Sequence, residues 1–217
     1  MSVFRRIINF FHSLFHREEK NVEPPVERPA QQQPTSIPEV VPYERVFHNV
    51  IFKDPFGNDT LTHEIDRIFV RRNGVFCIED KDWAGVIYGD EFSKNWKQVL
   101  GDGFTVHMHP NPILQNEVHE DVLEKIISSE EERYHVIPVV VMQEDNSPLS
   151  YNEKVINKRD LREFLLTHSS FDPELSNDEF HELCQVIEDN DQSPYISREE
   201  HVRNIRRNHP EAFSGRD

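Results

Sequence analysis

Alternating apolar and polar positions dominate the middle of the chain. The segments 44–54 (ERVFHNVIFKD), 61–70 (LTHEIDRIFV) and 75–81 (VFCIEDK) each follow the two-residue period of a strand. Because the turn sequences PFGND and RNG separate these segments, we expect a three-stranded antiparallel meander. A stretch expected to form a loop comes next, and it contains Trp83, Gly85, Trp96 and Gly103.

The apolar period changes at the segment NPILQNEVHEDVLEKII. Asn111 suits the N-cap of a helix, and Pro112 suits its first position, where the missing N–H costs nothing. The apolar run HVIPVVVM that follows is typical of a strand buried on both faces. Further helices are expected near 158–167 and 176–188, and Ser197 begins a capping box before a short charged helix. This order predicts an α/β (α+β) fold: an antiparallel meander, a helix, a further buried strand and C-terminal helices.

The N-terminal part of the chain has a different pattern. Residues 3–16 place Phe, Ile and Leu at spacings of three and four, which predicts an amphipathic helix. Four Arg or Lys residues and two acids make residues 1–20 net +2. Such a helix suits the interface of an anionic membrane, or docking on the folded body or on a partner protein, and these alternatives stay open. The expected organisation is a helix at 1–16, a flexible Pro/Gln-rich linker at 17–43, a folded domain at 44–205 and a tail at 206–217.

Composition limits the classes of protein that remain. A chain of 217 residues can bury one domain core, and no run approaches the ~20 apolar residues that span a bilayer. Cys77 and Cys184 cannot make a disulfide-dense scaffold, so we expect a cytoplasmic location, with the N-terminal helix as a means of attachment to the inner membrane. The formal net charge of −16 argues against a broadly basic DNA-binding surface. A DNA substrate would then require a local basic strip or a divalent metal.

A candidate site lies at the end of the third expected strand. Side chains two residues apart share a face, so Glu79 and Lys81 point one way and Asp80 the other. The tight turn brings Asp66, on the neighbouring strand, close to Glu79. Two converging carboxylates suit Mg²⁺ or Mn²⁺, because Mg²⁺ needs few protein ligands and keeps several waters. Lys81 would serve the attacking water or stabilise charge on a phosphate. A solvated ion pair at a strand end is the alternative interpretation.

The wider pattern resembles the nuclease-related domain (NERD) family of bacterial and archaeal proteins. The resemblance spans about residues 46–115 through the blocks EIDRIFV, NGVFCIEDK, AGVIYG, Trp96 and NPILQ. It continues more loosely through HVIPVVVM, LREFLL and REEHVRNIRRN. The family is a branch of the PD-(D/E)XK nuclease superfamily, so the resemblance implies a restriction-endonuclease-like core and Mg²⁺-dependent cleavage of DNA. The superfamily motif then falls on Asp66, on Glu79 and Lys81 as its E-x-K, and the glutamine of the NP-x-x-Q block on Gln115.

Two side chains beside this motif have alternative uses. Gln115 stands in the first turn of its helix and faces the sheet, so it can reach the water shell of a metal or a scissile phosphate. A role in capping or bridging the helix start is the alternative. Glu64 shares a strand face with Asp66, which makes it either an accessory ligand or an exposed partner for Arg67 or Arg72.

Only positions outside the strand pattern are left to complete the acidic set. The side chain of Asp80 points away from the site, but its backbone carbonyl is a candidate metal ligand. Many members of the superfamily carry an acid on a helix before the first core strand, and here Glu18, Glu19 or Glu44 would have to supply it. This departure favours a second hypothesis, a non-catalytic binding or adaptor module acting through its N-terminal helix. The intact Asp–Glu-x-Lys set favours the nuclease.

The remaining candidate residues are ambiguous. His107 and His109 share a strand face, which fits either a transition-metal pair or an exposed edge pair. Cys77 is expected to pack in the core, and no histidine stands out as its partner in a cysteine hydrolase. Trp83 and Trp96 suit stacking on unpaired bases or packing in the core or at its rim.

Overall fold

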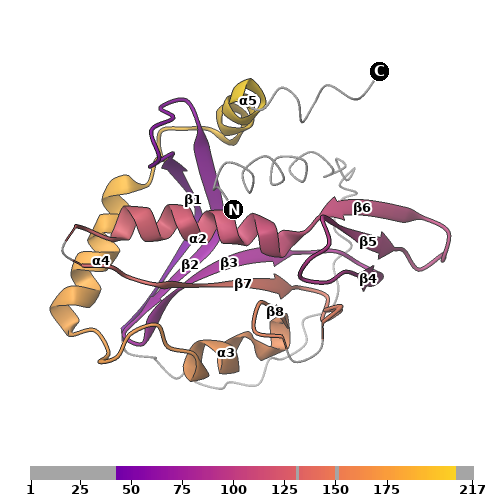
Figure 1. The fold of residues 1–217 in the computed structure, drawn as a ribbon, viewed down its shortest axis with the longest axis horizontal. Helices are drawn as coiled ribbons and strands as arrows, with labels where there is room; N and C mark the ends of the chain where they lie inside the picture. Colours follow the sequence, from indigo (N-terminus) through magenta and orange to yellow (C-terminus); the bar gives the residue numbers. More distant parts are fainter. Residues whose placement is uncertain (1–42, 131, 150–151, 209–217) are drawn as a thin grey trace, which may run out of the picture.

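The computed structural model describes residues 43–130, 132–149 and 152–208. Within these ranges the chain forms a five-stranded mixed sheet and a three-stranded antiparallel sheet, with four α-helices packed around them (Figure 1). No helix in these ranges is long and apolar enough to cross a membrane. The helix expected at 1–16, almost all of the linker and the end of the tail lie outside the described residues, so those expectations remain predictions.

The large sheet contains the predicted meander. Its strands are β1 (Glu44–Lys53), β2 (Thr62–Arg71), β3 (Gly74–Lys81), β7 (Val136–Met142) and β8 (Val155–Asn157), in the order β1-β2-β3-β7-β8. β1, β2 and β3 pair antiparallel, and the turn that joins Arg71 to Gly74 sets Ile68 opposite Cys77. β7 then pairs parallel with β3, and β8 parallel with β7. The predicted meander and the additional buried strand are therefore confirmed.

The stretch expected to form a loop instead forms the second sheet. Its strands are β4 (Val86–Tyr88), β5 (Asn95–Val99) and β6 (Val106–Pro110). Each strand is only three to five residues long and buries one or two side chains, so its alternation is too short to recognise in the sequence. Gly85 makes the entry to this sheet possible: its φ is +87°, and a Cβ there would lie 2.3 Å from the Val99 carbonyl oxygen.

The helices are α2 (Pro112–Ile127), α3 (Leu161–Thr167), α4 (Asn177–Asn190) and α5 (Arg198–Asn208). Two of the helices, α2 and α5, begin directly after the capping residues that the sequence predicted. The Asn111 side chain accepts a hydrogen bond from the Ile113 N–H at 2.9 Å, and its amide donates to the carbonyls of Asp90 and Ser93 at 3.1 and 2.8 Å. One residue therefore caps α2 and fastens its start to the loop between β4 and β5. Ser197 accepts from the Glu200 N–H at 3.2 Å at the start of α5.

Both faces of the large sheet are covered. α2 and α4 pack on one face over a cluster that includes Val75, Val122 and Ile187. α3 packs on the other face, where Phe76 meets Phe164 edge to face with ring centroids 6.2 Å apart. A third cluster, formed by Ile87, Trp96, Ile113, Val140, Met142 and Val155, joins the small sheet to α2 and β7. The small sheet therefore stands at the end of the large sheet where α2 begins (Figure 1).

Candidate active site

The candidate site lies where β2 and β3 separate beneath α2. The last residue pair in their ladder is Arg67 opposite Ile78, and Asp66 and Glu79 are the next residues on the two strands. Because side chains alternate, Asp66 and Glu79 emerge on the face that α2 covers. The Asp66 carboxylate accepts a hydrogen bond of 2.9 Å from the backbone N–H of Asp80. The two acids are thus held on neighbouring strands, just beyond the last β2–β3 residue pair.

Glu79 is the centre of a buried hydrogen-bonded group. Its side chain is 2 % exposed, and its Oε1 accepts hydrogen bonds from Lys81 Nζ and from Gln115 Nε2. Lys81 Nζ also donates to Gln115 Oε1 at 2.9 Å, so the three side chains form a closed triangle. Asn111 caps the helix, which leaves Gln115 to bridge the site rather than the helix start. The capping alternative for Gln115 was wrong.

His119 is a site residue that the sequence did not reveal. It lies one turn beyond Gln115 on α2, is 1 % exposed, and places Nδ1 3.3 Å from Glu79 Oε2. Glu79 therefore has Lys81 and Gln115 on one carboxylate oxygen and His119 beside the other. The i, i+4 spacing of Gln115 and His119 on the sheet-facing side of α2 was the available signal.

Burial and charge act in opposite directions on the two acids. Burial, followed by repulsion from the Glu79 carboxylate, raises the pKa of Asp66 to about 7. Burial also opposes ionisation of Glu79. The charge of Lys81 and the hydrogen bond and charge of His119 outweigh it, and they hold the pKa of Glu79 below its ordinary value. A positive charge placed beside Asp66 would favour its ionised form and so oppose both burial and the repulsion from Glu79.

Asp80 points away from this group, as its position on the strand predicted. Its carboxylate binds Arg67 through two hydrogen bonds of 2.6 Å and accepts another of 2.6 Å from Gln143. A carboxylate committed to that face cannot join Asp66 and Glu79. The expectation that its backbone carbonyl ligates a metal stays a prediction.

Glu64 lies towards α5. Its Oε2 is 3.8 Å from His201 Nε2 and 3.9 Å from Arg198 Nε. The alternative partners are engaged elsewhere, because Arg67 binds Asp80 and Arg72 donates to a backbone carbonyl. The expected pairing of Glu64 with Arg67 or Arg72 was wrong, since that prediction could not include a helix from the far end of the chain.

Glu44 does not supply the missing upstream acid. It pairs with Arg71 at 3.0 Å, at the last residue of β2 and five residues beyond Asp66. Strand register therefore excludes it from the site. Glu18 and Glu19 lie outside the described residues.

Among the histidine, cysteine and tryptophan candidates, some side chains are buried in the core and others keep part of their surface in solvent. Trp96 is fully buried in the core, so the hypothesis that it stacks on bases was wrong. Cys77 packs in the core as predicted, and burial raises the pKa of its thiol. His109 stacks on the half-buried Trp83, with ring centroids 4.2 Å apart, and His107 lies beside it. Within the described ranges, no three His, Cys, Asp or Glu side chains are grouped as a metal site.

The donor set of the site suits a hard divalent cation. It offers the carboxylates of Asp66 and Glu79, which emerge together from adjoining strands. Mg²⁺ is commonly held by one or two carboxylates while it keeps several waters, whereas structural Zn²⁺ requires four protein ligands. Burial and repulsion from Glu79 both disfavour the charged form of Asp66, and a bound cation would favour it. These residues therefore fit Mg²⁺ or Mn²⁺ and do not fit a structural zinc.

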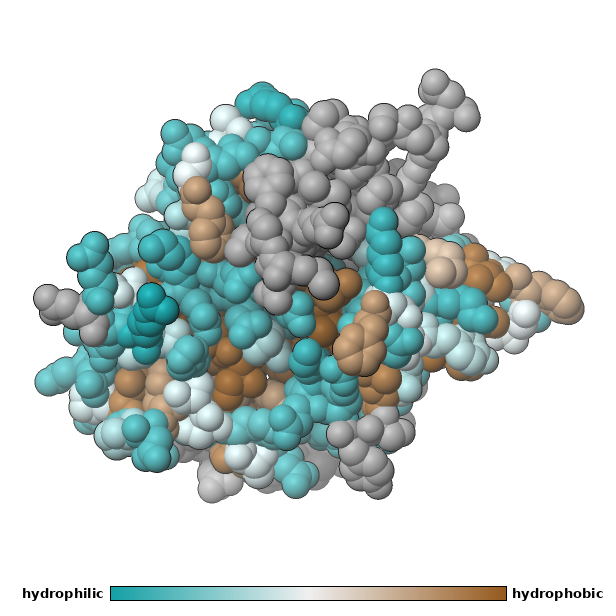
Figure 2. Space-filling view, in the orientation of Figure 1, coloured by the Kyte–Doolittle hydropathy of each residue, from teal (hydrophilic) through white to brown (hydrophobic). Residues whose placement is uncertain are grey.

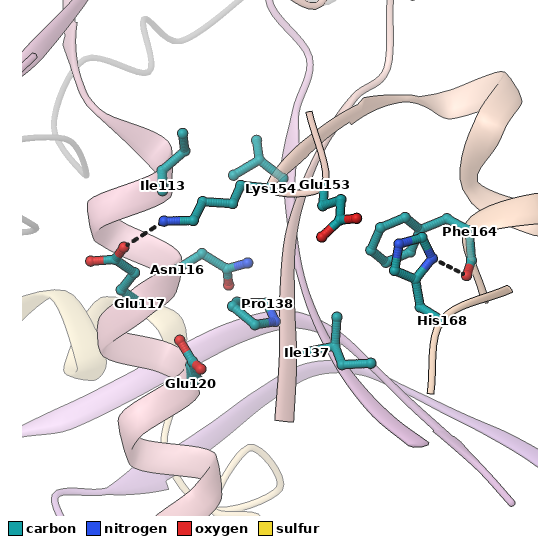
Figure 3. Close-up of a pocket in the computed structure, with 11 residues that line it drawn as sticks. Ile113, Asn116, Glu117, Glu120, Ile137, Pro138, Glu153, Lys154, Phe164 and His168 are labelled. Carbon is teal, nitrogen blue, oxygen red and sulfur yellow. Dashed lines mark hydrogen bonds and ion pairs between the residues drawn. The ribbon is translucent and has the colours of Figure 1, made fainter. Parts of the chain in front are cut away.

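A separate cleft lies between α2, β7 and α3. It has a volume of about 320 Å³, and Figure 3 shows side chains of α2 on one side and the stacked Phe164 and His168 on the other. Glu117 and Lys154 form an ion pair of 3.5 Å at its rim. The residues that line the cleft include neither Asp66 nor the Glu79 triangle. The candidate catalytic residues thus lie outside this cleft.

Similarity to known proteins agrees with the geometry. The nuclease-related domain family matches residues 31–143, over half of the chain. An uncharacterized protein of Bacillus anthracis is 29% identical over 150 residues, which cover 65% of this chain. The match spans 65% of the length of that relative. No solved structure matches the chain. The protein belongs to the nuclease-related domain family.

Proposed function

We propose that this protein hydrolyses phosphodiester bonds in DNA with Mg²⁺ or Mn²⁺ held by Asp66 and Glu79. The observation that carries the proposal is the buried triangle of Glu79, Lys81 and Gln115 beside a carboxylate whose pKa is raised to about 7. Such a group of charged and polar side chains is costly to bury, and strongly perturbed pKa values gather at functional sites. Membership of a nuclease-related family supports the same reaction class.

Asp66 and Glu79 are the two side chains that would bind the cation. When bound, a divalent ion lowers the pKa of a coordinated water and neutralises charge on the phosphate. The carboxylates come from two paired strands, so their backbones are rigid and their separation is fixed before substrate arrives. Pre-organised ligands of this kind lose little conformational entropy on binding.

Lys81 is placed to act on the reacting groups. Its ammonium bonds to both Glu79 and Gln115, so the flexible side chain is held at the mouth of the site. There it would orient the attacking water or stabilise negative charge that develops on the phosphate. The compact charge of a lysine is sufficient for this role, because a contact to phosphate oxygens does not have to distinguish one base from another.

Gln115 and His119 act through the other residues. Gln115 keeps Glu79 and Lys81 in one arrangement, and His119 supports the second oxygen of Glu79. Side chains that orient a ligand in this way commonly change metal affinity or activity by about 10- to 100-fold when they are removed. They are positioning residues in this proposal.

The experiment is a cleavage assay with plasmid and with single-stranded DNA, in Mg²⁺, in Mn²⁺ and in EDTA. We expect metal-dependent nicking or degradation by the wild type, and losses of about a hundredfold or more for Asp66→Ala and Lys81→Ala. Asp82→Asn, which changes an exposed acid just after β3, is the matched control and should keep wild-type activity. Equal product from the wild type and both site variants, or no product with either metal, would contradict the proposal.

A further inference from the structure

A line of aromatic and basic side chains leads out of the candidate site along the small sheet. Lys81 Nζ lies 5.5 Å from the Trp83 ring centroid, and Trp83 stacks on His109 with 4.2 Å between centroids and 17° between planes. The His107 ring centroid lies 6.2 Å beyond His109. We call Trp83, His109 and His107 the aromatic strip. Its residues come from the loop after β3 and from β6, so the strip connects the proposed catalytic group to the small sheet.

Part-buried hydrogen bonds hold Trp83 and His109 of the aromatic strip in place. His109 Nε2 donates to Gln98 Oε1 at 2.9 Å, and the Gln98 amide donates to the Ala84 carbonyl at 2.7 Å. On the other side of the loop, Asn146 donates to the Trp83 carbonyl at 2.7 Å. The backbone and the ring positions are therefore set in advance. A pre-set aromatic surface loses little conformational entropy when a ligand stacks on it.

The aromatic strip is less buried than the core, although Trp83 packs partly against it. Trp96 is fully buried and fills the contact between the small sheet and α2, whereas Trp83, His107 and His109 all keep part of their surface in solvent. The opposite face of the small sheet exposes aliphatic side chains instead of rings, because Val106 and Met108 are about half exposed there. Figure 2 shows apolar surface on the small sheet. The rings beside Lys81 are thus accessible, stacked and next to the proposed metal ligands.

The net charge of the chain restricts what the strip can bind. At −16, the protein as a whole repels a polyanion, so phosphate contacts alone give little affinity. Stacking of unpaired bases on aromatic rings needs no basic surface, and the loss of one stacked base typically costs about fivefold or more in affinity. Bases inside a duplex are stacked on each other and offer no face to a ring. An unpaired strand is therefore the form of DNA that this surface fits.

We propose that the aromatic strip binds unpaired bases next to the phosphate to be cut, so that the preferred substrate is single-stranded DNA or a duplex with an unpaired flank. This inference rests on the proposed function, which places the reacting phosphate at Lys81. Trp83 and His109 are specificity-determining residues in it, because they discriminate the unpaired strand from the duplex. His107 extends the strip away from the site.

The test measures binding of the full chain in EDTA, where cleavage does not occur. Three fluorescein-labelled oligonucleotides of equal length are compared by fluorescence anisotropy in a buffer of low ionic strength. They are an oligothymidine strand, an abasic strand of the same charge, and a duplex. We expect the oligothymidine strand to bind about tenfold or more tightly than the abasic strand and the duplex. Trp83→Ala and His109→Ala should each remove most of this difference. Tyr195→Ala, which changes an aromatic side chain that is 80 % exposed outside the small sheet, should not.

The outcomes separate this inference from the proposed function. Equal binding of base-bearing and abasic strands, or tighter binding of the duplex, would overturn the inference even if the protein cuts DNA. Base-dependent binding that disappears in Trp83→Ala and His109→Ala would uphold it even if no cleavage is found. Because Trp83 partly packs against the core, circular dichroism checks each variant. If Trp83→Ala fails to fold, unchanged binding by a folded His109→Ala protein is the result that overturns the inference.

Discussion

Replacing Asp66 by asparagine should stabilise the protein in the absence of metal. Burial, and then repulsion from Glu79, raise the pKa of Asp66 from 3.8 to about 7. Between these values the folded protein binds more protons than the unfolded chain, so its stability falls as the pH rises. Each pKa unit is worth about 1.4 kcal/mol, so ionised Asp66 lowers the free energy of unfolding by about 4 kcal/mol above pH 7. Asparagine carries no charge and can still accept from the Asp80 N–H.

Urea unfolding in EDTA measures this effect. Asp66→Asn should exceed the wild type in unfolding free energy by up to about 4 kcal/mol at pH 8, and the difference should shrink towards zero near pH 4. Asp82→Asn, at an exposed position, removes the same charge and should stabilise the protein by no more than about 0.5 kcal/mol.

Divalent metal should stabilise the wild type more than it stabilises Asp66→Asn. Mg²⁺ that binds the folded wild type at 100 times its dissociation constant adds about 2.7 kcal/mol of stability, and Asp66→Asn should gain much less. A lower stability of Asp66→Asn than of the wild type at pH 8 without metal would refute the predicted effect of the buried Asp66 charge. A difference in stability that does not depend on pH would refute it as well.

Three further predictions test the surrounding structure. Burial, followed by the charges of His63, His119 and Arg198, lowers the pKa of His201 to about 4. Below the ordinary pKa of histidine, the unfolded chain takes up a proton that the folded protein excludes. The free energy of unfolding should therefore fall by about 2 kcal/mol from pH 7 to pH 5. Urea unfolding in the Asp66→Asn background measures this, and a slope that His201→Gln leaves unchanged would contradict it. Asn111→Ala removes the cap of α2 and its bonds to the β4–β5 loop, so thermal unfolding should show a loss of about 1 to 3 kcal/mol; no loss would refute the role of Asn111 as an anchor. Cys77 and Cys184 are buried, and burial raises both thiol pKa values, so a thiol reagent should label the native protein slowly and the urea-unfolded chain fast; rapid labelling of the native protein would contradict the packing.

The large sheet was predictable because its strands are long and their turns are short. The two-residue turn after Arg71 sets the register of β2 against β3, so Asp66 must adjoin Glu79. Two-residue periodicity alone then directs Glu79 and Lys81 to one face and Asp80 to the other. These local rules fixed three residues of the candidate site, and Asn111 fixed the start of the helix that covers it.

The parts that were missed depend on long-range packing. The three strands of the small sheet are short, and their burial depends on Trp96 reaching a core built by α2 and β7. In the sequence, His119 is only a polar residue within a predicted helix. Its position beside Glu79 follows from the packing of α2 on β3. Glu64 meets His201, which is 137 residues later in the sequence by their numbers, so no local pattern reports that contact.

If Asp66 and Glu79 hold the ion that supports DNA cleavage, the loss of one of these carboxylates must slow the reaction. End-labelled single-stranded DNA is cleaved under single-turnover conditions in Mg²⁺ by the wild type and by Asp66→Asn, whose metal-free fold should be the more stable of the two. We predict a cleavage rate at least about a hundredfold lower for Asp66→Asn, with no cleavage by either protein in EDTA. A rate equal to that of the wild type in this folded, more stable variant would contradict the account.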